Sequence, residues 1–346
     1  MKVGFIQPAT RTGEAGYAKY LKEGLLKRRV KIQPITSSFF RKPNIRIFLG
    51  SLVLRGFTNP EKMDIMHNLD NLGPYLLPNN TPVRRVLTVH DIAPVVLPHL
   101  YSSLVRFNFK NILPVLIRNS DVVIVPSRAT KQDLVRYFSI PPGKVEVIPL
   151  GIDTTYFYPR HRDERVLKKY GITGEYLIYV GTDNPRKNLK NLILAFSQLP
   201  NQLDLDLVLV GPIHKGNLMK SVPDMGERII FPGYVDEPDL PVLYSASEAL
   251  ILPSLYEGFG LPLLESMACG TPVIASNNSA ITEVVGDAGV LIPDPENPPM
   301  ISRAIQKLCE NEDLRLELTR KGLERVNNFT WDNTVTKTLQ LYQDLL

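Results

Sequence analysis

The sequence predicts an α/β protein made of two domains, each a parallel sheet with helices on both faces. Three observations lead to this fold class. Short apolar runs alternate with helix-like segments, about eleven such runs occur in 346 residues, and the two halves of the chain differ in charge. Alternating strands and helices indicate parallel sheets, and eleven strands are too many for one comfortable sheet. We expect the two doubly wound domains to face each other across a cleft, with ligands at the carboxyl ends of the strands.

The apolar runs give the expected order of elements. In the first half, strands are predicted at residues 3–7, 63–67, 86–89, 122–125 and 145–148, and helices at 17–29 and 129–138. In the second half, strands are predicted at residues 176–180, 205–210, 229–231, 249–252, 273–275 and 290–291. Helices are predicted there at residues 188–198, 237–246, 262–268 and 298–311. Gly13 and Gly16 fall in the first predicted strand-to-helix turn, which resembles a dinucleotide fingerprint without its full glycine spacing.

The domain boundary is expected within residues 151–170, where turn residues and charges mix. Residues 1–150 carry 22 Lys and Arg against 9 Asp and Glu, whereas residues 151–346 carry 18 against 26. We therefore predict one domain over residues 1–160 and another over 161–330, with a C-terminal helix at 331–346 completing the first.

Composition places the chain among ordinary globular proteins. It is 44% hydrophobic and 22% charged, the first residues show no signal pattern, and no apolar stretch is long enough to cross a bilayer. The two cysteines, Cys269 and Cys309, are too few for a disulfide framework and are expected to be reduced thiols. We expect a cytoplasmic protein.

The stretch LILPSLYEGFGLPLLESMACGTPVIAS, residues 250–276, carries the clearest chemical signal. A buried strand is followed by Glu257, by a turn containing Gly258 and Gly260, and by a helix that contains Glu265. Glycines permit a close approach of backbone to ligand, and a helix N-terminus attracts negative charge. Two acids beside such a turn suit a ligand with both hydroxyls and phosphates, although acids near a helix start are also common for structural reasons alone.

Two further clusters follow predicted strands. Gly181 ends the strand at 176–180, and Arg186 and Lys187 come in the next loop, where adjacent cations suit a diphosphate. His90 ends the strand at 86–89, where it could contact a sugar or handle a proton. Taken alone, the cations could equally be solvent-facing and the histidine a satisfied core residue.

These segments together resemble the family 4 retaining glycosyltransferases, also described as glycosyl transferases group 1, which have the GT-B fold. The spacing of Glu257 and Glu265 matches the E-x7-E motif of that family. The segments VGTDNPRKNL, VVIVPSRATKQDLVRYF, VEVIPLGIDTTYFYP, ITEVVGDAGVLIPDPENP and FTWDNTVTKTLQLYQDLL resemble family segments in the same order. The resemblance covers most of the chain and is weaker over residues 1–85.

The resemblance implies that the second domain binds a nucleotide-activated sugar and that the first lies on the acceptor side. Arg186 and Lys187 would contact the diphosphate, and Glu265 would hydrogen-bond the ribose. Glu257 and the backbone of Gly258, Phe259, Gly260 and Leu261 would hold the donor sugar and its phosphate.

Four other positions match family residues at the donor. Tyr234 and Val235 match the place where the family holds the base, His90 matches a histidine at the donor sugar, and Gly16 matches a glycine that lets the first loop approach the phosphate. The chain departs from the family at Thr182, where many members carry Arg.

The implied reaction retains the anomeric configuration. No double-displacement nucleophile is evident, so we expect the acceptor hydroxyl to attack from the same face. Arg186, Lys187 and the helix N-terminus at Leu261 would stabilise the departing diphosphate more in the transition state than in the ground state. Because such charges can replace a metal, we expect no metal ion and no other cofactor. We also expect the chain to lack an Asp-x-Asp motif, which could hold a metal.

Rival functions remain open at this point. Paired carboxylates also occur in glycosidases, and the Gly13–Gly16 turn also suits a nicotinamide-dependent oxidoreductase. A catalytically silent nucleotide-sugar-binding protein would keep the same binding residues. A soluble-acceptor enzyme, such as a sucrose, trehalose or glycogen-type synthase, is a further alternative.

The expected donor is GDP-mannose, with a UDP-sugar as the alternative, because GTDNPRKN resembles segments of mannosyl-transferring subgroups. The expected acceptor is a glycan, a glycolipid or a polyprenyl-linked sugar. The segment FFRKPNIRIFLGSLVLRGF, residues 39–57, interleaves apolar and basic residues. It favours peripheral attachment to an anionic membrane surface. Nucleic acid is not an expected partner, because the aromatic residues do not recur as stacking platforms.

Overall fold

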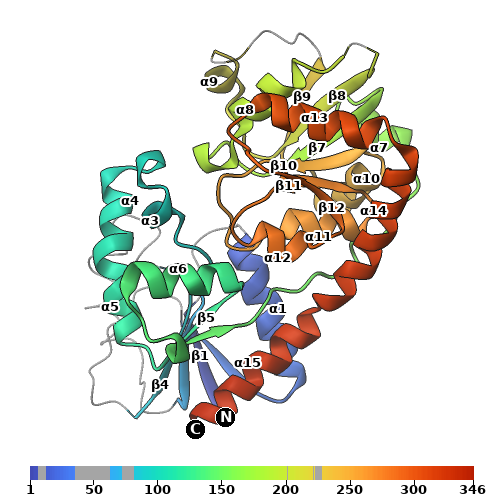
Figure 1. Cartoon of the computed structure of the whole chain (residues 1–346). Coiled ribbons are helices and arrows are strands. Elements are labelled where there is room, and N and C mark those ends of the chain that lie inside the picture. The colour runs from blue at the N-terminus through green and yellow to red at the C-terminus, as the bar shows by residue number, and fades with distance from the viewer. Residues whose placement is uncertain (7–12, 36–62, 72–81, 201, 221, 223–227) are drawn as a thin grey trace. The chain divides into compact units, whose positions relative to one another are not determined.

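The computed structural model describes residues 1–6, 13–35, 63–71, 82–200, 202–220, 222 and 228–346. The chain forms two compact units (Figure 1). Unit 1 comprises Met1–Gly151 and Thr330–Leu346, and unit 2 comprises Ile152–Phe329. The segment 39–57, which carries the predicted membrane contact, lies outside the described residues.

Unit 1 is built on a six-stranded parallel sheet in the order β2-β1-β3-β4-β5-β6. Its strands are β1 Lys2–Ile6, β2 Lys31–Ile35, β3 Ile65–Asn68, β4 Arg84–Thr88, β5 Val122–Val125 and β6 Val145–Val147. The order reverses direction after β2, which is the pattern of a doubly wound sheet. The central strands are buried at nearly every position, as expected for strands that are covered by helices on both faces.

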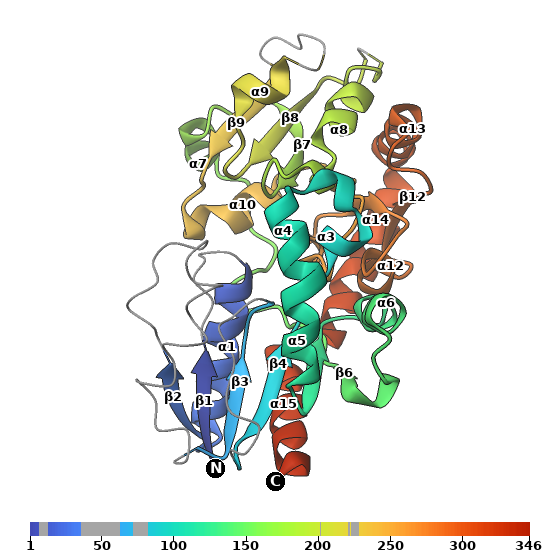
Figure 2. The same ribbon diagram turned by 90° about the vertical axis from the view of Figure 1, so that its left-hand side faces the viewer.

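The helices of unit 1 cover both faces of this sheet (Figures 1 and 2). They are α1 Gly13–Lys27, α3 Ala93–Val96, α4 Ser103–Phe107, α5 Leu113–Arg118, α6 Arg128–Phe138 and α15 Trp331–Leu345. A π-helical stretch, Asn108–Ile112, joins α4 to α5. The C-terminal α15 packs against α1 on the same side of the sheet, where Tyr20 and Trp331 stack with ring centroids 4.7 Å apart. Arg28, which directly follows α1, forms an ion pair with Asp332 of α15, with Nη2 and Oδ1 2.6 Å apart.

Unit 2 is built on a second six-stranded parallel sheet, in the order β12-β11-β10-β7-β8-β9. Its strands are β7 Glu175–Val180, β8 Leu205–Val210, β9 Ile229–Gly233, β10 Ala249–Leu252, β11 Val273–Ser276 and β12 Gly289–Ile292. The chain builds outward from β7 to β9 and then returns to add β10 on the other side of β7. The strand order therefore reverses between β7 and β10, and the carboxyl ends of two such strands form the usual ligand site of this fold.

The helices of unit 2 are α7 Glu164–Lys169, α8 Leu189–Phe196, α9 Lys215–Met219, α10 Leu240–Ser245, α11 Leu261–Ala268, α12 Ile281–Val285, α13 Pro298–Cys309 and α14 Glu312–Arg325. The helix α13 packs on α8, and α14 packs on α11. Residues 176–179 of β7 and all residues of β10 are fully buried between these layers, which fixes the positions from which the following loops start.

The predicted fold class is confirmed: both sheets are parallel and each has helices on both faces. The strands predicted from apolar runs agree with the observed ones to within two residues at each end. The strand β2 was not predicted, because its sequence, KIQPI, is polar at alternate positions and contains a proline. The prediction that Gly13 and Gly16 lie in a turn is wrong, because α1 begins at Gly13 and includes both.

Two expectations about the whole chain can be compared with the structure. Cys269 and Cys309 are both free thiols. Among the residues that the structure describes, no helix combines the length and the apolar character that a bilayer crossing requires.

Candidate functional site

The carboxyl ends of β7 and β10 bring three predicted site residues together. β7 leads to a 3-10 turn, Pro185–Lys187, and β10 leads to the loop that carries Glu257. These strands are hydrogen-bonded neighbours in the sheet. The two loops are joined directly, because the Leu255 amide donates to the Arg186 carbonyl at 2.8 Å.

Glu257 forms an ion pair with each of the two neighbouring cations. Arg186 Nη1 lies 2.7 Å from Glu257 Oε2, and Lys187 Nζ lies 2.5 Å from Glu257 Oε1. The side chains of Arg186, Lys187 and Glu257 are 18%, 12% and 6% exposed, respectively. Arg186 Nη1 also donates to the Tyr256 carbonyl at 2.8 Å. The carboxylate therefore holds two nearly buried cations side by side at the edge of the sheet.

The electrostatic state of Glu257 follows from this arrangement. Burial alone would raise the pKa of its carboxyl, but Arg186 and Lys187 outweigh burial and lower the pKa to about 2. Ser254 assists by donating a 2.6 Å hydrogen bond to Oε1. Glu257 is consequently an anion at neutral pH.

The loop around Glu257 is held by polar side chains that were not predicted as site residues. The Glu257 amide donates to Ser279 Oγ at 3.0 Å, and Ser279 Oγ donates to Asn278 Oδ1. Asn278 Nδ2 in turn donates to the carbonyls of Ser254 and Leu255. These residues come from the loop after β11, and the dense Ser and Asn content of SNNSA was the only sequence signal for them.

Asn188 has a comparable role beside the cations. It adopts a left-handed backbone with φ of 63°, which asparagine tolerates better than most residues. Its Nδ2 donates to the carbonyls of Pro253 and Pro295, at 3.1 and 2.6 Å. The 3-10 turn with Arg186 and Lys187 is thereby anchored to the strand β10 side of the site.

The glycine turn has the predicted backbone geometry. Gly260 has a φ of +104°, and a Cβ at this position would lie 2.9 Å from the Leu263 side chain. The eight-residue helix α11 then starts at Leu261, with Pro262 in its first turn. Phe259 is buried and packs edge-on against Phe329. The backbone from Gly258 to Leu261 thus passes tightly from Glu257 into the helix N-terminus.

Glu265 lies in α11, one turn further along than Leu261, and has a different environment from Glu257. Its Oε2 accepts a 2.8 Å hydrogen bond from the hydroxyl of Tyr244 in α10. Burial raises the pKa of Glu265 to about 7, although the Tyr244 hydrogen bond acts in the opposite direction. The two acids of the E-x7-E pair therefore differ in charge state near neutral pH.

The other predicted residues of unit 2 lie at the ends of β7 and β9. Gly181 follows β7, and a Cβ on neighbouring Gly211 would lie 1.9 Å from the Gly181 carbonyl, so the two loops require this close backbone approach. Tyr234 directly follows β9 and is 80% exposed, while Val235 beside it is half-buried. An exposed aromatic ring in this position offers a flat surface for stacking.

His90 and Gly16 are the predicted residues of unit 1, and His90 lies close to the residue that follows Gly16 in the chain. The His90 amide donates to Asn71 Oδ1 at 2.7 Å, and His90 Nε2 lies 3.0 Å from the Leu69 carbonyl. The imidazole also meets the Tyr17 ring edge-on, with centroids 5.2 Å apart. Gly16 lies in the first turn of α1, and a Cβ there would contact no other atom within 4 Å.

A buried polar network in unit 1 was not predicted. His67 Nδ1 lies 2.5 Å from the Tyr342 hydroxyl, and His67 Nε2 lies 2.7 Å from Thr88 Oγ1. Tyr17 reaches the same Thr88 hydroxyl at 3.2 Å. Burial, followed by the nearby His90, lowers the pKa of His67 to about 3. His67 is therefore neutral and links α15 to the centre of the sheet.

The expectation that the chain lacks an Asp-x-Asp motif is wrong. Asp204-Leu205-Asp206 is such a motif, at the start of β8. Arg186 and Lys187 follow the opposite, carboxyl end of the neighbouring strand β7. Six strand residues span roughly 20 Å, so the motif lies at the far edge of the sheet from the ion pairs of Glu257.

This geometry is that of the GT-B glycosyltransferases. Such proteins have two α/β units, each with a parallel sheet, and here the E-x7-E acids and a basic pair follow strands of one of the two sheets. Residues 163–325 match the family "Glycosyl transferases group 1", and residues 9–156 match "Glycosyltransferase Family 4". The chain therefore belongs to the group 1 glycosyltransferases and is a glycosyltransferase by family.

Two related sequences and one solved structure show the similarity in detail. The O-antigen chain mannosyltransferase B of Escherichia coli is 34% identical over 270 residues, 75% of this chain and 70% of that protein. The serotype-specific mannosyltransferase WbdA of Escherichia coli is 28% identical over 281 residues, 78% of this chain but 34% of that protein. Sucrose-phosphate synthase from Thermosynechococcus elongatus has the same fold, with a TM-score of 0.81 at 21% identity over 100% of this chain and 99% of that chain.

Proposed function

We propose that the protein is a retaining hexosyltransferase that moves mannose from GDP-mannose to a glycan or a lipid-linked sugar. The observation that carries the proposal is the pairing of Glu257 with both Arg186 and Lys187 at the carboxyl ends of β7 and β10. This arrangement presents two cations and a carboxylate within one small region of the sheet edge. A nucleotide-diphosphate sugar offers the complementary groups, namely two phosphates and several hydroxyls.

The proposed mechanism rests on charge. Cleavage of the sugar–phosphate bond leaves a diphosphate that carries additional negative charge. Arg186 and Lys187, held in place by Glu257, and the N-terminus of α11 stabilise that charge without reorganising. The proposal therefore needs no metal at this site, because the cations supply the positive charge that a metal would supply elsewhere. The acceptor hydroxyl attacks from the face that the leaving group vacates, which retains the configuration.

The other residues take the roles that the family resemblance implies. Glu257 and the Gly258–Leu261 backbone hold the sugar and its phosphate, and Glu265 binds the ribose hydroxyls. Tyr234 and Val235 hold the base, for which the 80% exposed Tyr234 ring offers a stacking surface. Roles for His90 and Gly16 toward the donor remain predictions of the resemblance.

The choice of mannose draws on sequence relatives. Two relatives, 34% and 28% identical to this chain, are named mannosyltransferases. The segment from Gly181 to Asn188, GTDNPRKN, also resembles mannosyl-transferring subgroups. A UDP-sugar is the alternative donor.

The test is a calorimetric screen of GDP-mannose, GDP-glucose, UDP-glucose and ADP-glucose, followed by transfer assays. The proposal expects GDP-mannose to bind most tightly and its anomeric configuration to be kept in the product, as read by NMR. Tighter binding of UDP-glucose would overturn the donor assignment, and an inverted product would overturn the retaining mechanism. Binding without any turnover on glycan and lipid-linked acceptors would favour a silent binding protein.

A further inference from the structure

A histidine and an aspartate join the loops that follow β7 and β8 in unit 2. His214 Nδ1 lies 2.6 Å from Asp183 Oδ2, and the His214 amide donates to the same oxygen at 2.9 Å. The strands β7 and β8 are paired in parallel along all of β7. The aspartate–histidine pair therefore lies at the same carboxyl edge of the sheet as the loop that carries Arg186 and Lys187.

The contacts of this pair determine which way its hydrogen-bonding groups face. Burial raises the pKa of the Asp183 carboxyl, but hydrogen bonds from the His214 amide and imidazole outweigh burial and hold that pKa below its usual value. Asp183 is therefore a carboxylate that accepts the Nδ1–H of the imidazole. The second ring nitrogen, Nε2, then lies on the side of the ring that faces away from Asp183. The His214 side chain is 75% exposed, so a ligand can reach that side.

The buried Tyr179 connects the aspartate–histidine pair with the ion pairs of Glu257. Its hydroxyl donates to the Thr182 carbonyl at 2.7 Å. Burial raises the pKa of Tyr179 well above its usual range, and the charges that act on it next are those of Glu257, Arg186 and Asp183. One hydroxyl at the end of β7 thus lies within electrostatic reach of both groups of charges. The pair is consequently part of the surroundings of the candidate site.

The strand order places the pair between two predicted parts of the donor site. Because β8 lies between β7 and β9, the loop with His214 lies between the loop with Lys187 and the segment that begins at Tyr234. The loops after β8 and β9 also start side by side, since the Gly211 amide donates to the Gly233 carbonyl at 2.9 Å. A nucleotide with its diphosphate at Lys187 and its base at Tyr234 would therefore pass the end of β8.

We propose that His214 is a further donor-binding residue, which donates Nε2–H to a phosphate of the nucleoside diphosphate, and that Asp183 is its positioning residue. This role rests on the proposed function, because it requires the nucleotide to bind at this edge of the sheet. An imidazole takes up its second proton near neutral pH, and a neighbouring phosphate favours the charged form. Asp183 holds Nδ1 on the opposite side of the ring. The phosphates are common to GDP and UDP, so the role does not depend on the base.

The alternative is that the pair only fastens two loops together. The two nitrogens of His214 can be tested separately, because asparagine and glutamine each place an amide nitrogen near one of them. His214→Asn keeps a donor near Nδ1 for Asp183 but loses the outer donor. His214→Gln places a donor near Nε2 but loses the side-chain bond to Asp183. A ligand contact and a loop fastener therefore predict opposite orders of affinity for these two variants.

The experiment is calorimetry of both variants with GDP and, in parallel, with UDP. We expect His214→Asn to bind the nucleoside diphosphate about tenfold more weakly, as for the loss of a hydrogen bond to a charged group. His214→Gln should lose no more than about threefold, because a neutral donor still reaches the phosphate. The affinity for guanosine or uridine, measured by competition, should not change in either variant, since neither ligand has a phosphate.

The matched control is His161→Asn, which removes another exposed histidine of unit 2. The neighbouring Arg162 pairs with Glu175 at the amino end of β7, so His161 belongs to the opposite edge of the sheet. This variant should bind both nucleotides like the unaltered chain.

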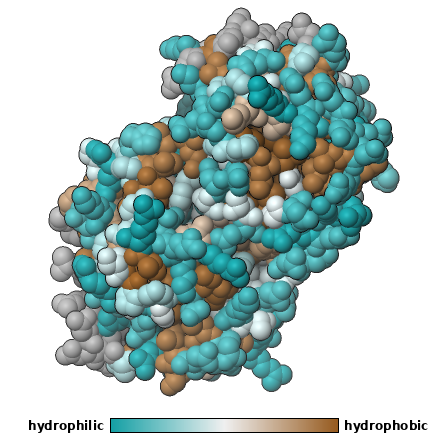
Figure 3. Space-filling model, viewed as in Figure 1, coloured by the Kyte–Doolittle hydropathy of each residue, from teal (hydrophilic) through white to brown (hydrophobic). Residues whose placement is uncertain are grey.

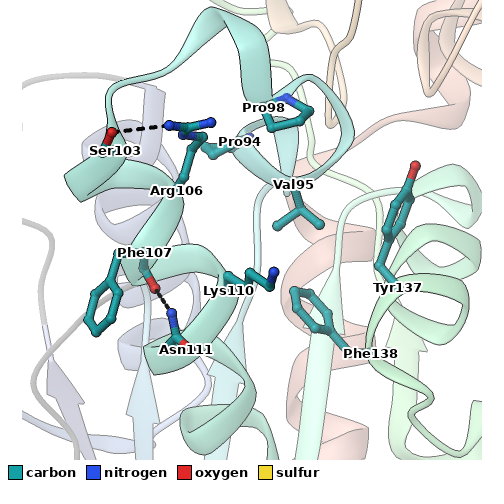
Figure 4. A pocket seen from close by; sticks show the side chains of 10 residues that line it. All are labelled: Pro94, Val95, Pro98, Ser103, Arg106, Phe107, Lys110, Asn111, Tyr137 and Phe138. Carbon is teal, nitrogen blue, oxygen red and sulfur yellow. Dashed lines mark hydrogen bonds between the residues drawn. The ribbon is translucent and has the colours of Figure 1, made fainter.

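A basic region of unit 1 requires a control of its own. A cavity of about 680 Å³ between α3, α4 and α6 is lined by Arg106 and Lys110 together with Phe107, Tyr137 and Phe138 (Figure 4). Figure 3 shows hydrophobic side chains among hydrophilic ones over this part of unit 1. Such surroundings suit a phosphate poorly, because its charge must be kept solvated or paired. Arg106→Ser/Lys110→Ser should therefore leave the affinity for GDP and UDP unchanged.

A second measurement uses the unaltered chain. Diethyl pyrocarbonate modifies accessible imidazole nitrogens, and mass spectrometry of the peptides gives the rate at each histidine. A saturating nucleoside diphosphate should slow the modification of His214, because the phosphate covers Nε2. The modification of His161 should keep its rate.

Three results would overturn the role of His214. A larger loss of affinity in His214→Gln than in His214→Asn would show that the pair only fastens the loops. Equal affinity in both variants and the unaltered chain would show a solvated pair without a ligand. Unslowed modification of His214 under saturating nucleotide would exclude the contact directly. If neither GDP nor UDP binds the unaltered chain, the proposed function fails, and the role of His214 fails with it.

Discussion

The hydroxyl of Tyr244 donates a 2.8 Å hydrogen bond to Glu265 Oε2 within unit 2. Tyr244 is fully buried, and its backbone carbonyl also accepts hydrogen bonds from Thr271 and Ser247. The buried Tyr244 side chain thus contacts the Glu265 carboxylate through one of its two oxygens. Other groups near this carboxyl are Tyr156 and Cys269, and Arg160 lies close to both of them.

The first prediction concerns Tyr244→Phe. Burial raises the pKa of Glu265 to about 7, and the Tyr244 hydroxyl limits that rise. Losing the hydroxyl should raise the pKa further, so the ionised form that accepts from ribose hydroxyls would form only at higher pH. We expect the pH midpoint of nucleotide affinity to move upward, with KM affected more than kcat. An unchanged pH profile, measured by calorimetry from pH 6 to 9, would show that Tyr244 has only a packing role.

The second prediction is that Glu265→Gln stabilises the fold at high pH. The folded pKa of about 7 lies above the value of 4.5 for an ordinary glutamate, so ionisation between these values favours the unfolded chain. Stability associated with this group is present below pH 4.5 and is lost as pH rises through 7. At pH 8 the free energy of unfolding of the variant should be about 1–2 kcal/mol higher than that of the unaltered chain. This figure is reduced to allow for the partial exposure of Glu265. At pH 5 the gain in the free energy of unfolding should be much smaller. Urea unfolding measures both values, and the surface variant Glu310→Gln should show no such difference between pH 8 and pH 5.

Loss of Lys187 should reduce catalysis strongly. Lys187→Ala removes one of the two cations paired with Glu257, and kcat/KM should fall about 10²-fold, as for the loss of one transition-state charge stabiliser. Lys190→Ala, three residues along on the exposed face of α8, is the matched control and should retain activity. Near-normal turnover in folded Lys187→Ala would remove this residue from the proposed site.

Glu257→Gln and Glu265→Ala should separate sugar from nucleotide. The first change affects the group assigned to the sugar, and the glutamine oxygen can still accept a hydrogen bond from a cation that Glu257 pairs with, so transfer should fall much more than the affinity for the free nucleotide. The second affects the group assigned to ribose, so nucleotide affinity itself should fall. Calorimetry with the nucleotide diphosphate measures both, and the reverse pattern would exchange the two assignments.

Metal independence is the fifth prediction. Arg186 and Lys187 are proposed to carry the charge stabilisation, so transfer should continue after dialysis against EDTA. Activity that disappears with EDTA and returns with Mg²⁺ or Mn²⁺ would contradict the prediction. Asp204→Asn/Asp206→Asn is the informative variant in that case, since it alters the Asp-x-Asp sequence at the far edge of the sheet.

Local patterns were sufficient to predict much of the fold. The strands β5 and β10 are short apolar runs with every residue buried, and a parallel sheet between helices requires that pattern. The strand β2 could not be recognised in the same way. It pairs with β1 alone at the edge of the sheet, where polar positions and Pro34 are tolerated.

The candidate site was predictable only to the level of its individual residues. The glycine turn and the E-x7-E spacing marked Glu257, but its pairing with Arg186 and Lys187 depends on β7 and β10 being neighbours. The supporting Ser279 and Asn278 come from the loop after β11, and His67 contacts a tyrosine 275 residues away. Such contacts are set by tertiary structure, which no short sequence pattern encodes.

The helix α15 gives the molecule an unusual order of assembly. Unit 1 contains both the first 151 residues and the last 17, whereas unit 2 is one continuous segment. During synthesis, unit 2 can therefore fold as soon as its residues leave the ribosome, while unit 1 must wait until α15 has been made. Until then, Tyr20 lacks Trp331 and the buried His67 lacks Tyr342. Unit 1, although most of it is made before unit 2, would therefore become complete after it.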